Sequence, residues 1–174
     1  MKKINTQDLA FTALFAALVF VATYITKIPN PATGGYSHTG DCMIFLAVMI
    51  LGKRNGSIAA AIGAALSDLL AGAAVWVFPT LIIKFIAAYI AGTIMEKSPA
   101  SRKLQMTGAA CGGIFQIIAY TLVKIVLMGT SPALLSIPHV TAQTLLGIVL
   151  FAVLARVLSR NGEMAVFMKR GENR

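Results

Sequence analysis

The chain has 174 residues, of which 57% are hydrophobic and only 12% are charged, and its mean hydropathy is +0.80. A soluble domain has about 45–50% apolar and about 25% charged residues, so this composition excludes an ordinary cytosolic globule, and it is also the opposite of a disordered chain. A net charge of +9 would suggest nucleic acid in a soluble protein, but basic loops also orient membrane helices.

Six apolar segments follow one another along the chain, and each is a candidate membrane helix because about 20 apolar residues cross a bilayer core. Their approximate ranges are 8–26, 39–52, 55–72, 79–95, 103–128 and 138–159. The second segment is short for a full crossing, so we expect it to follow a loop that dips into or folds over the outer end. Pro79 and Pro138 stand where helices would begin, and Gly52 and Gly72 stand where helices would end.

The basic residues alternate between the two ends of these segments. Twelve of the 15 Lys and Arg fall on one side, Lys27 falls on the other, and Lys84 and Lys124 lie inside segments. The stretches 73–78 and 129–137 carry no charge and are expected to be outer loops. By the positive-inside rule, the sequence predicts one all-α membrane domain over residues 1–174, with six helices and both termini in the cytoplasm. This distribution also removes nucleic acid as the reason for the net charge.

Four charged residues of the predicted spans lie away from the cytoplasmic ends of those spans. Such a charge costs about 2.5–3.5 kcal/mol on insertion scales unless it finds a partner or a wet cavity. Counted from the predicted helix ends at about 1.5 Å per residue, all four lie in one shallow layer under the outer face. They are Asp41, Asp68, Lys84 and Lys124.

Other polar and aromatic residues lie near that layer. A spacing of four places Gln116 and Tyr120 on the face of Lys124, and places His139 and Gln143 on another helix face. The sequence predicts a polar, aromatic-lined pocket that opens outward and is closed below by small residues. Its residues are Tyr36, His38, Asp41, Asp68, Trp76, Lys84, Gln116, Tyr120, Lys124, His139 and Gln143.

Plainer interpretations of these residues stay open. Lys84 and Lys124 can extend along apolar surface to the interface, and Asp68 can form a structural ion pair with Lys84. Trp76 and Tyr120 can be interfacial aromatic anchors. We expect neither a metal nor a cofactor, because no diagnostic spacing joins the candidate ligands His38, Asp41, Cys42 and His139.

The first segment carries a face of small residues. Ala10, Ala13 and Ala17 recur at i, i+3 and i+7, which permits close contact with another helix. Packing within the chain and docking onto another membrane subunit both explain this face.

Several motifs resemble the S components of energy-coupling factor (ECF) vitamin transporters, which are their substrate-binding membrane subunits. Residues 12–17 (TALFAA) resemble the family's alanine motif for docking to a transmembrane coupling subunit. Four further stretches are similar to the riboflavin-type subgroup, which includes predicted pyridoxine and hydroxymethylpyrimidine transporters. They are residues 35–41 (GYSHTGD), 51–56 (LGKRNG), 63–72 (GAALSDLLAG) and 79–84 (PTLIIK). Thr39 stands where the family often has a hydrophobic residue.

The resemblance implies a binding subunit of a prokaryotic plasma-membrane importer, and not an enzyme. Such a subunit captures a vitamin through the first loop and helices four to six, docks through the alanine face, and topples in the membrane. Two separate ATPase subunits drive release. The chain itself has no GxxxxGK[ST] motif, so we do not expect it to hydrolyse ATP by that route.

Composition and charge also bear on the ligand. Two aspartates and two lysines balance formally, and the outer aromatic residues are few, which favours a small neutral ring such as vitamin B6 or hydroxymethylpyrimidine over riboflavin. A small membrane enzyme and a channel are the alternatives of another class. A channel needs a polar path across the whole membrane, whereas the inner half of each segment is small or apolar.

Overall fold

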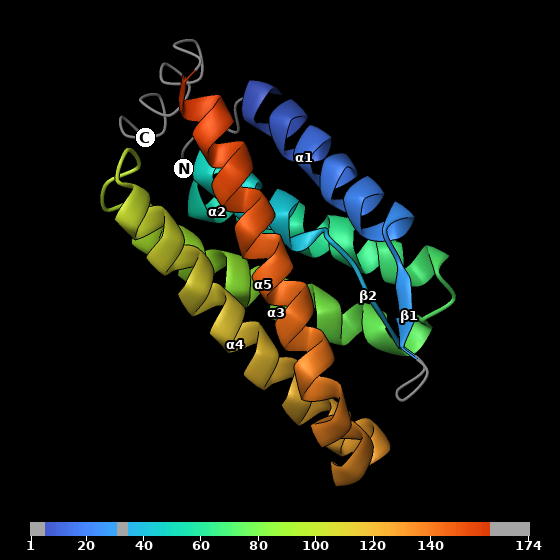
Figure 1. The fold of residues 1–174 in the computed structure, drawn as a ribbon. Helices are drawn as coiled ribbons and strands as arrows, with labels where there is room; N and C mark the ends of the chain where they lie inside the picture. Colours follow the sequence, from blue (N-terminus) through green and yellow to red (C-terminus); the bar gives the residue numbers. More distant parts are fainter. Residues whose placement is uncertain (1–5, 31–34, 161–174) are drawn as a thin grey trace.

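The computed structural model describes residues 6–30 and 35–160. In these ranges the order of elements is α1 (Thr6–Ile25), β1 (Ile28–Asn30), β2 (Gly35–Ser37), α2 (Asp41–Leu70), α3 (Ala74–Met95), α4 (Arg102–Met128) and α5 (Thr130–Arg160). The five helices are each long and apolar enough to cross a membrane. The start of α1, the end of α5 and the α3–α4 turn lie at one end of the bundle, and the β1–β2 hairpin lies towards the other (Figure 1). The two ends of the chain, residues 1–5 and 161–174, lie outside the described ranges. They contain five of the twelve basic residues that the charge pattern places on one side.

A break at Gly52 turns α2 back on itself. Gly52 has φ 78° and ψ 172°, a conformation that favours glycine. A Cβ placed on Gly56 would lie 2.6 Å from the Cα of Val48, whereas eight residues of straight helix span about 12 Å. Residues 41–51, the first arm, therefore pack against residues 53–70, the second arm. The predicted segments 39–52 and 55–72 correspond to these two arms, which join at Gly52 within one element.

The turn between the arms is tied to the end of α3. The backbone N–H of Lys53 donates a hydrogen bond of 2.7 Å to the carboxylate of Glu96, and the Lys53 ammonium lies 3.1 Å from the same carboxylate. The carboxylate thereby caps the free N–H at the start of the second arm.

α3 and α5 begin earlier than their prolines predicted. α3 starts at Ala74 and α5 at Thr130, so Pro79 and Pro138 lie inside helices, and the expected loops 73–78 and 129–137 are almost entirely helical. Each proline loses one backbone hydrogen bond, which membrane helices tolerate because neighbouring groups compensate. As a result, Lys84 lies ten residues, about 15 Å, from the start of α3, deeper than the sequence suggested. Gly72, with φ 75°, ends α2 as predicted.

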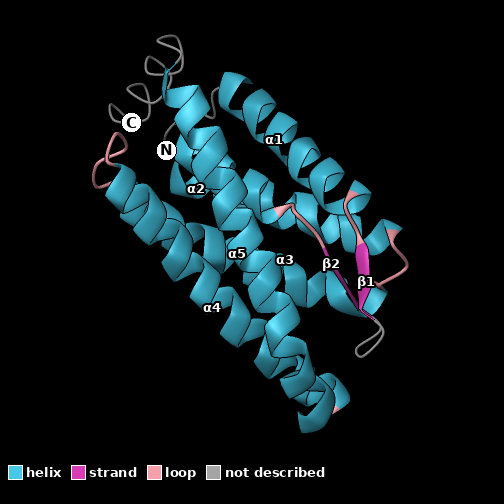
Figure 2. Ribbon diagram, in the orientation of Figure 1, coloured by secondary structure: helices cyan, strands magenta, loops and turns pink. Residues whose placement is uncertain are grey.

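The connection between α1 and α2 forms a short β-hairpin. β1 pairs with β2 in antiparallel register, with Ile28 opposite Ser37 (Figure 2, magenta). The all-α prediction is therefore incomplete, because strands of three residues are too short to show an alternating pattern. The hydroxyl of Thr26, just after α1, accepts the backbone N–H of Thr39, just after β2, at 2.9 Å, and this bond joins the two ends of the connection.

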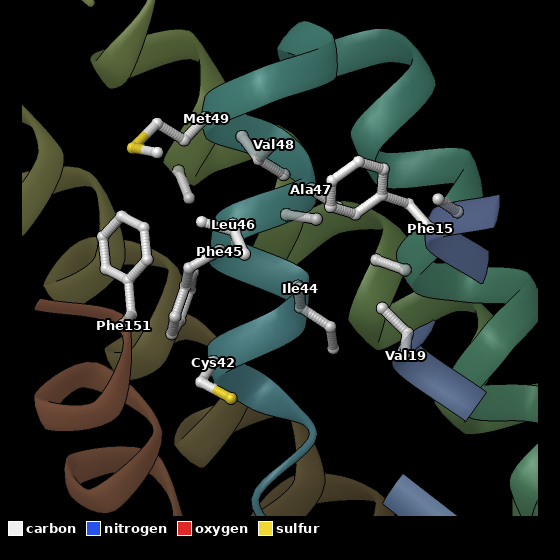
Figure 3. Packing of buried hydrophobic residues seen from close by; sticks show 14 of the residues in the cluster. Phe15, Val19, Cys42, Ile44, Phe45, Leu46, Ala47, Val48, Met49 and Phe151 are labelled. Carbon is white, nitrogen blue, oxygen red and sulfur yellow. The ribbon is translucent and has the colours of Figure 1, made fainter. Parts of the chain in front are cut away.

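The hydrophobic core surrounds the first arm of α2. Ile44, Phe45 and Val48 are buried there, with Val19 of α1 on one side and Phe151 of α5 on the other (Figure 3). The ring centroids of Phe45 and Phe151 lie 5.8 Å apart. The first arm is thus the central element, and its N-terminal end is where polar residues of α3, α4 and α5 converge.

Candidate functional site

A buried ion pair joins the start of α2 to the middle of α3. The ammonium Nζ of Lys84 donates to Oδ1 of Asp41 at 2.5 Å, and both side chains are 1% exposed. Asp41 lies in the first turn of α2, where the helix dipole stabilises a negative charge. Because desolvation of two charges is costly, such a pair needs further hydrogen bonds.

Amides from α4 and α5 supply those bonds. Oε1 of Gln116 accepts from Lys84 at 2.8 Å, and Nε2 of Gln116 donates to Oδ2 of Asp41 and to the Thr144 hydroxyl, each at 2.7 Å. Nε2 of Gln143 donates to the same Oδ2 at 3.3 Å. We refer to Asp41, Lys84, Gln116, Gln143 and Thr144 as the polar cluster.

Glycines allow the helices to bring these side chains together. A Cβ placed on Gly147 of α5 would lie 2.6 Å from the Cβ of Asp41, and one placed on Gly112 of α4 would lie 2.6 Å from the carbonyl oxygen of Ala87. Any larger residue would push α5 from α2 or α4 from α3. The predicted small-residue packing beside the polar faces is therefore confirmed at these two positions.

Aromatic residues extend the site along α4. The Tyr120 hydroxyl donates to the hydroxyl of Thr80 at 3.1 Å, and the Tyr120 ring centroid lies 5.5 Å from Nζ of Lys84 and 6.3 Å from the ring centroid of Trp76. Nζ of Lys124 lies 6.0 Å from the Trp76 centroid, and Lys124 is only 8% exposed. Trp76 thus has both Tyr120 and the ammonium of Lys124 as neighbours.

The two histidines differ in their surroundings. His38 is buried just before α2, and its Nδ1 accepts the backbone N–H of Gly40 at 3.1 Å. Burial lowers the pKa of His38 to about 4, although the charge of Asp41 opposes this shift, so the imidazole is neutral at neutral pH. His139 is half-buried on α5, and its Nε2 has no hydrogen-bond partner among the described residues.

Neither Asp68 nor Tyr36 is part of the polar cluster. Lys84 pairs with Asp41 rather than with Asp68, the partner that its sequence suggested. Asp68 is buried near the end of the second arm, and its charge acts on Lys27, where it opposes the lowering of the Lys27 pKa by burial. The backbone of Tyr36 lies in β2, and its side chain is outside the described part.

Two threonines of the site, Thr80 and Thr144, were not predicted from the sequence. Thr80 was detectable because it precedes Lys84 by four residues on the same helix face. Thr144 gave no signal, since threonines in apolar helices usually bond to their own backbone. In this chain Thr12, Thr93 and Thr121 each donate to the carbonyl four residues earlier.

The small-residue face of α1 is exposed in the part of the chain that the structure describes. Ala10, Ala13 and Ala17 are exposed, whereas Ala16 is buried and its backbone lies against Gly63 of the second arm. Packing within the described part of the chain therefore does not account for these three alanines.

Comparison with known proteins gives three matches over this fold. Residues 3–160 match the model of a family described as ECF-type riboflavin transporter, S component. An uncharacterized protein in a gap 3' region of Pyrococcus woesei is 31% identical over 142 residues, which cover 82% of this chain and 95% of that protein. The thiamine precursor transporter HmpT of Lactococcus lactis subsp. cremoris is 28% identical over 166 residues, which cover 95% of both chains. All five helices and the polar cluster lie within the range of the family match.

Proposed function

Because this chain belongs to the S components of ECF-type riboflavin transporters, a family of multi-pass transporter subunits and not of enzymes, we propose that it binds a thiamine-precursor pyrimidine. The observation that carries this proposal is the polar cluster, in which a carboxylate, an ammonium and two amides meet from four helices. Such a set of placed polar groups between apolar helices is typical of small-molecule sites.

Hydroxymethylpyrimidine matches these groups. Its exocyclic amine donates hydrogen bonds, which a carboxylate such as Asp41 accepts, and its ring nitrogens and hydroxyl accept from amides or from an ammonium. Its flat ring can stack on Trp76 or Tyr120. The name of the lactococcal relative favours the pyrimidine over vitamin B6, and the description of the family makes riboflavin the second candidate.

The cluster has bonding capacity left for a ligand. Lys84 donates to two acceptors among the described residues, which leaves one N–H of its ammonium. The amide of Gln143 makes the longest hydrogen bond of the cluster, 3.3 Å. In our proposal, the amide of Gln143 breaks its hydrogen bond to Asp41 and forms one to the ligand. Lys84 uses its third N–H to donate a hydrogen bond to the ligand.

We also propose the arrangement in the membrane and the partners. The two arms of α2 each cross, so that the chain crosses six times with both termini in the cytoplasm of a prokaryotic cell. Support comes from the fold-back at Gly52 and from the twelve basic residues that this arrangement gathers on the inside. The exposed face of Ala10, Ala13 and Ala17 docks onto a transmembrane coupling subunit, and two ATPase subunits drive toppling and release.

The test is to identify the small molecules that co-purify with the protein by mass spectrometry, for the native chain and for two variants. Gln143→Leu removes an amide of the polar cluster, whereas Gln105→Leu removes a buried amide that bonds to Pro99 at the start of α4. We expect the pyrimidine with the native chain and with Gln105→Leu, and much less with Gln143→Leu. Recovery of pyridoxine or riboflavin in its place would refute the pyrimidine assignment.

A further inference from the structure

Lys124 is a buried cation that forms no ion pair with a carboxylate of the described residues. The carboxylate of Glu96 pairs with Lys53, and the carboxylate of Asp41 pairs with Lys84. Lys124 is 8% exposed, and its ammonium has the ring of Trp76 as its neighbour, at 6.0 Å. The site therefore carries one positive charge beyond the neutral pair of Asp41 and Lys84.

The ring of Trp76 does not compensate for burial of this charge. The attraction of a cation to an aromatic face is smaller than the cost of burying a lysine inside a membrane helix. A buried ammonium that is not compensated within its own chain points to an anion that arrives with a ligand.

The position of Lys124 also argues against simple extension to the membrane surface. A lysine that reaches for the interface exposes its head group. Lys124 instead lies on the face of α4 that carries Gln116 and Tyr120, while its neighbours Val126 and Leu127 are exposed. The ammonium is thus directed to the same side of α4 as the polar cluster.

We propose that Lys124 forms an anion subsite, which binds the phosphate group of a phosphate monoester of the pyrimidine. The inference rests on the proposed function. Gln116 and Lys124 are eight residues apart on α4, about 12 Å along the helix axis. A ring bonded to the polar cluster lies beside Tyr120 and Trp76, and an esterified hydroxymethyl group extends from it towards Lys124.

Trp76 is the only tryptophan of the chain and reports directly on this subsite. The experiment follows its fluorescence in a phosphate-free detergent, with hydroxymethylpyrimidine, its phosphate monoester and inorganic phosphate as probes. Lys124→Met keeps the length of the side chain without the charge, and Lys124→Arg keeps the charge. We expect the native chain to bind the monoester about tenfold tighter than the alcohol, as one charge-assisted bond would give. Lys124→Met should lose this difference, and Lys124→Arg should retain it.

The other outcomes separate the two proposals. Equal affinity of the native chain for alcohol and monoester, or equal weakening of both in Lys124→Met, overturns the anion subsite and leaves the pyrimidine site standing. If neither pyrimidine binds but inorganic phosphate gives a saturable change that requires the charge of Lys124, the subsite stands and the pyrimidine assignment fails. If phosphatidylcholine nanodiscs abolish the response seen in detergent, Lys124 binds lipid phosphate and the ligand subsite is overturned.

Discussion

At the residue scale, the site depends on two opposite charges that form an ion pair away from water. Asp41 and Lys84 are bound to each other and to Gln116, so each charge has a partner and a neutral hydrogen bond. Loss of one partner leaves the other charge buried, which costs far more than the pair contributes. Single substitutions at these residues are therefore expected to change stability as well as the proposed ligand binding.

We predict that Lys84→Met lowers the free energy of unfolding by about 3–5 kcal/mol, because it leaves the carboxylate of Asp41 unpaired. Lys84→Met combined with Asp41→Asn should recover most of that loss, since neither charge remains. Unfolding in detergent measures both variants. A double variant as unstable as Lys84→Met alone would show that the ion pair is not the source of the loss.

His38 makes stability depend on pH. Its native pKa is about 4, below the ordinary value of 6.5, so between these values the unfolded chain binds a proton that the native chain does not. The contribution of His38 to stability is therefore complete above pH 6.5 and is lost as the pH decreases towards 4. We expect the native chain to lose about 2 kcal/mol more than His38→Asn between pH 7 and pH 5 in detergent. Identical losses in the two proteins would contradict a neutral buried imidazole.

At the element scale, α1 presents two different faces. Ala16 and Val19 pack towards the second arm of α2, while Ala10, Ala13 and Ala17 form an exposed face that suits close contact with another helix. The residues of the polar cluster lie on α2 to α5 and not on α1. The proposed docking face and the proposed binding site can therefore be tested by separate substitutions.

We predict that Ala13→Trp leaves ligand binding intact and abolishes uptake in cells that hold the complete transporter. Leu18→Trp is the matched control, because Leu18 is also exposed but lies about 140° around the helix from Ala13. Titration with ligand and uptake of radiolabelled ligand measure the two properties. Normal uptake by Ala13→Trp would refute the docking face.

At the scale of the whole molecule, Gly52 decides how the chain crosses the membrane. If the two arms of α2 each cross, the α3–α4 turn lies inside and the α4–α5 turn lies outside. If α2 crossed only once, both assignments would reverse. The basic residues at the α3–α4 turn, Lys97, Arg102 and Lys103, favour the first arrangement.

Cysteine labelling distinguishes these arrangements. In a chain without Cys42 and Cys111, we expect Thr130→Cys to react with an impermeant maleimide added to intact cells, and Ala100→Cys to react only after the cells are opened. Both positions are exposed in turns or at helix starts. The reverse pattern would rule out six crossings and cytoplasmic termini.

Much of this molecule follows from its sequence, and the reasons for the exceptions are physical. The apolar segments gave the helices, and spacing by four found Gln116, Tyr120 and Lys124 on one face of α4. The starts of α3 and α5 were predicted too late in the chain, because Ala74–Phe78 and Thr130–Ile137 are apolar or small and extend the helices to the N-terminal side of Pro79 and Pro138. That error put Lys84 in the same shallow layer as Lys124.

The sequence could not show which aspartate forms the ion pair with Lys84. One turn of the chain, at Gly72, separates Asp68 from Lys84, and two turns, at Gly52 and Gly72, separate Asp41 from it. Only the packing of the first arm against α3 and α5 decides which aspartate pairs with Lys84. With Asp41 as partner, the site acquires the unbalanced charge of Lys124, which formal counting of aspartates and lysines had concealed.

The central claim is that the polar cluster binds a thiamine-precursor pyrimidine. The measurement that tests it most directly is calorimetric titration of the purified chain with hydroxymethylpyrimidine, pyridoxine and riboflavin in turn. We predict saturable binding of the pyrimidine or its phosphate ester at a stoichiometry of one, weakened at least about tenfold by Gln143→Leu and unchanged by Gln105→Leu. Binding of riboflavin or pyridoxine with no heat from either pyrimidine, or equal affinities in the two variants, would contradict it.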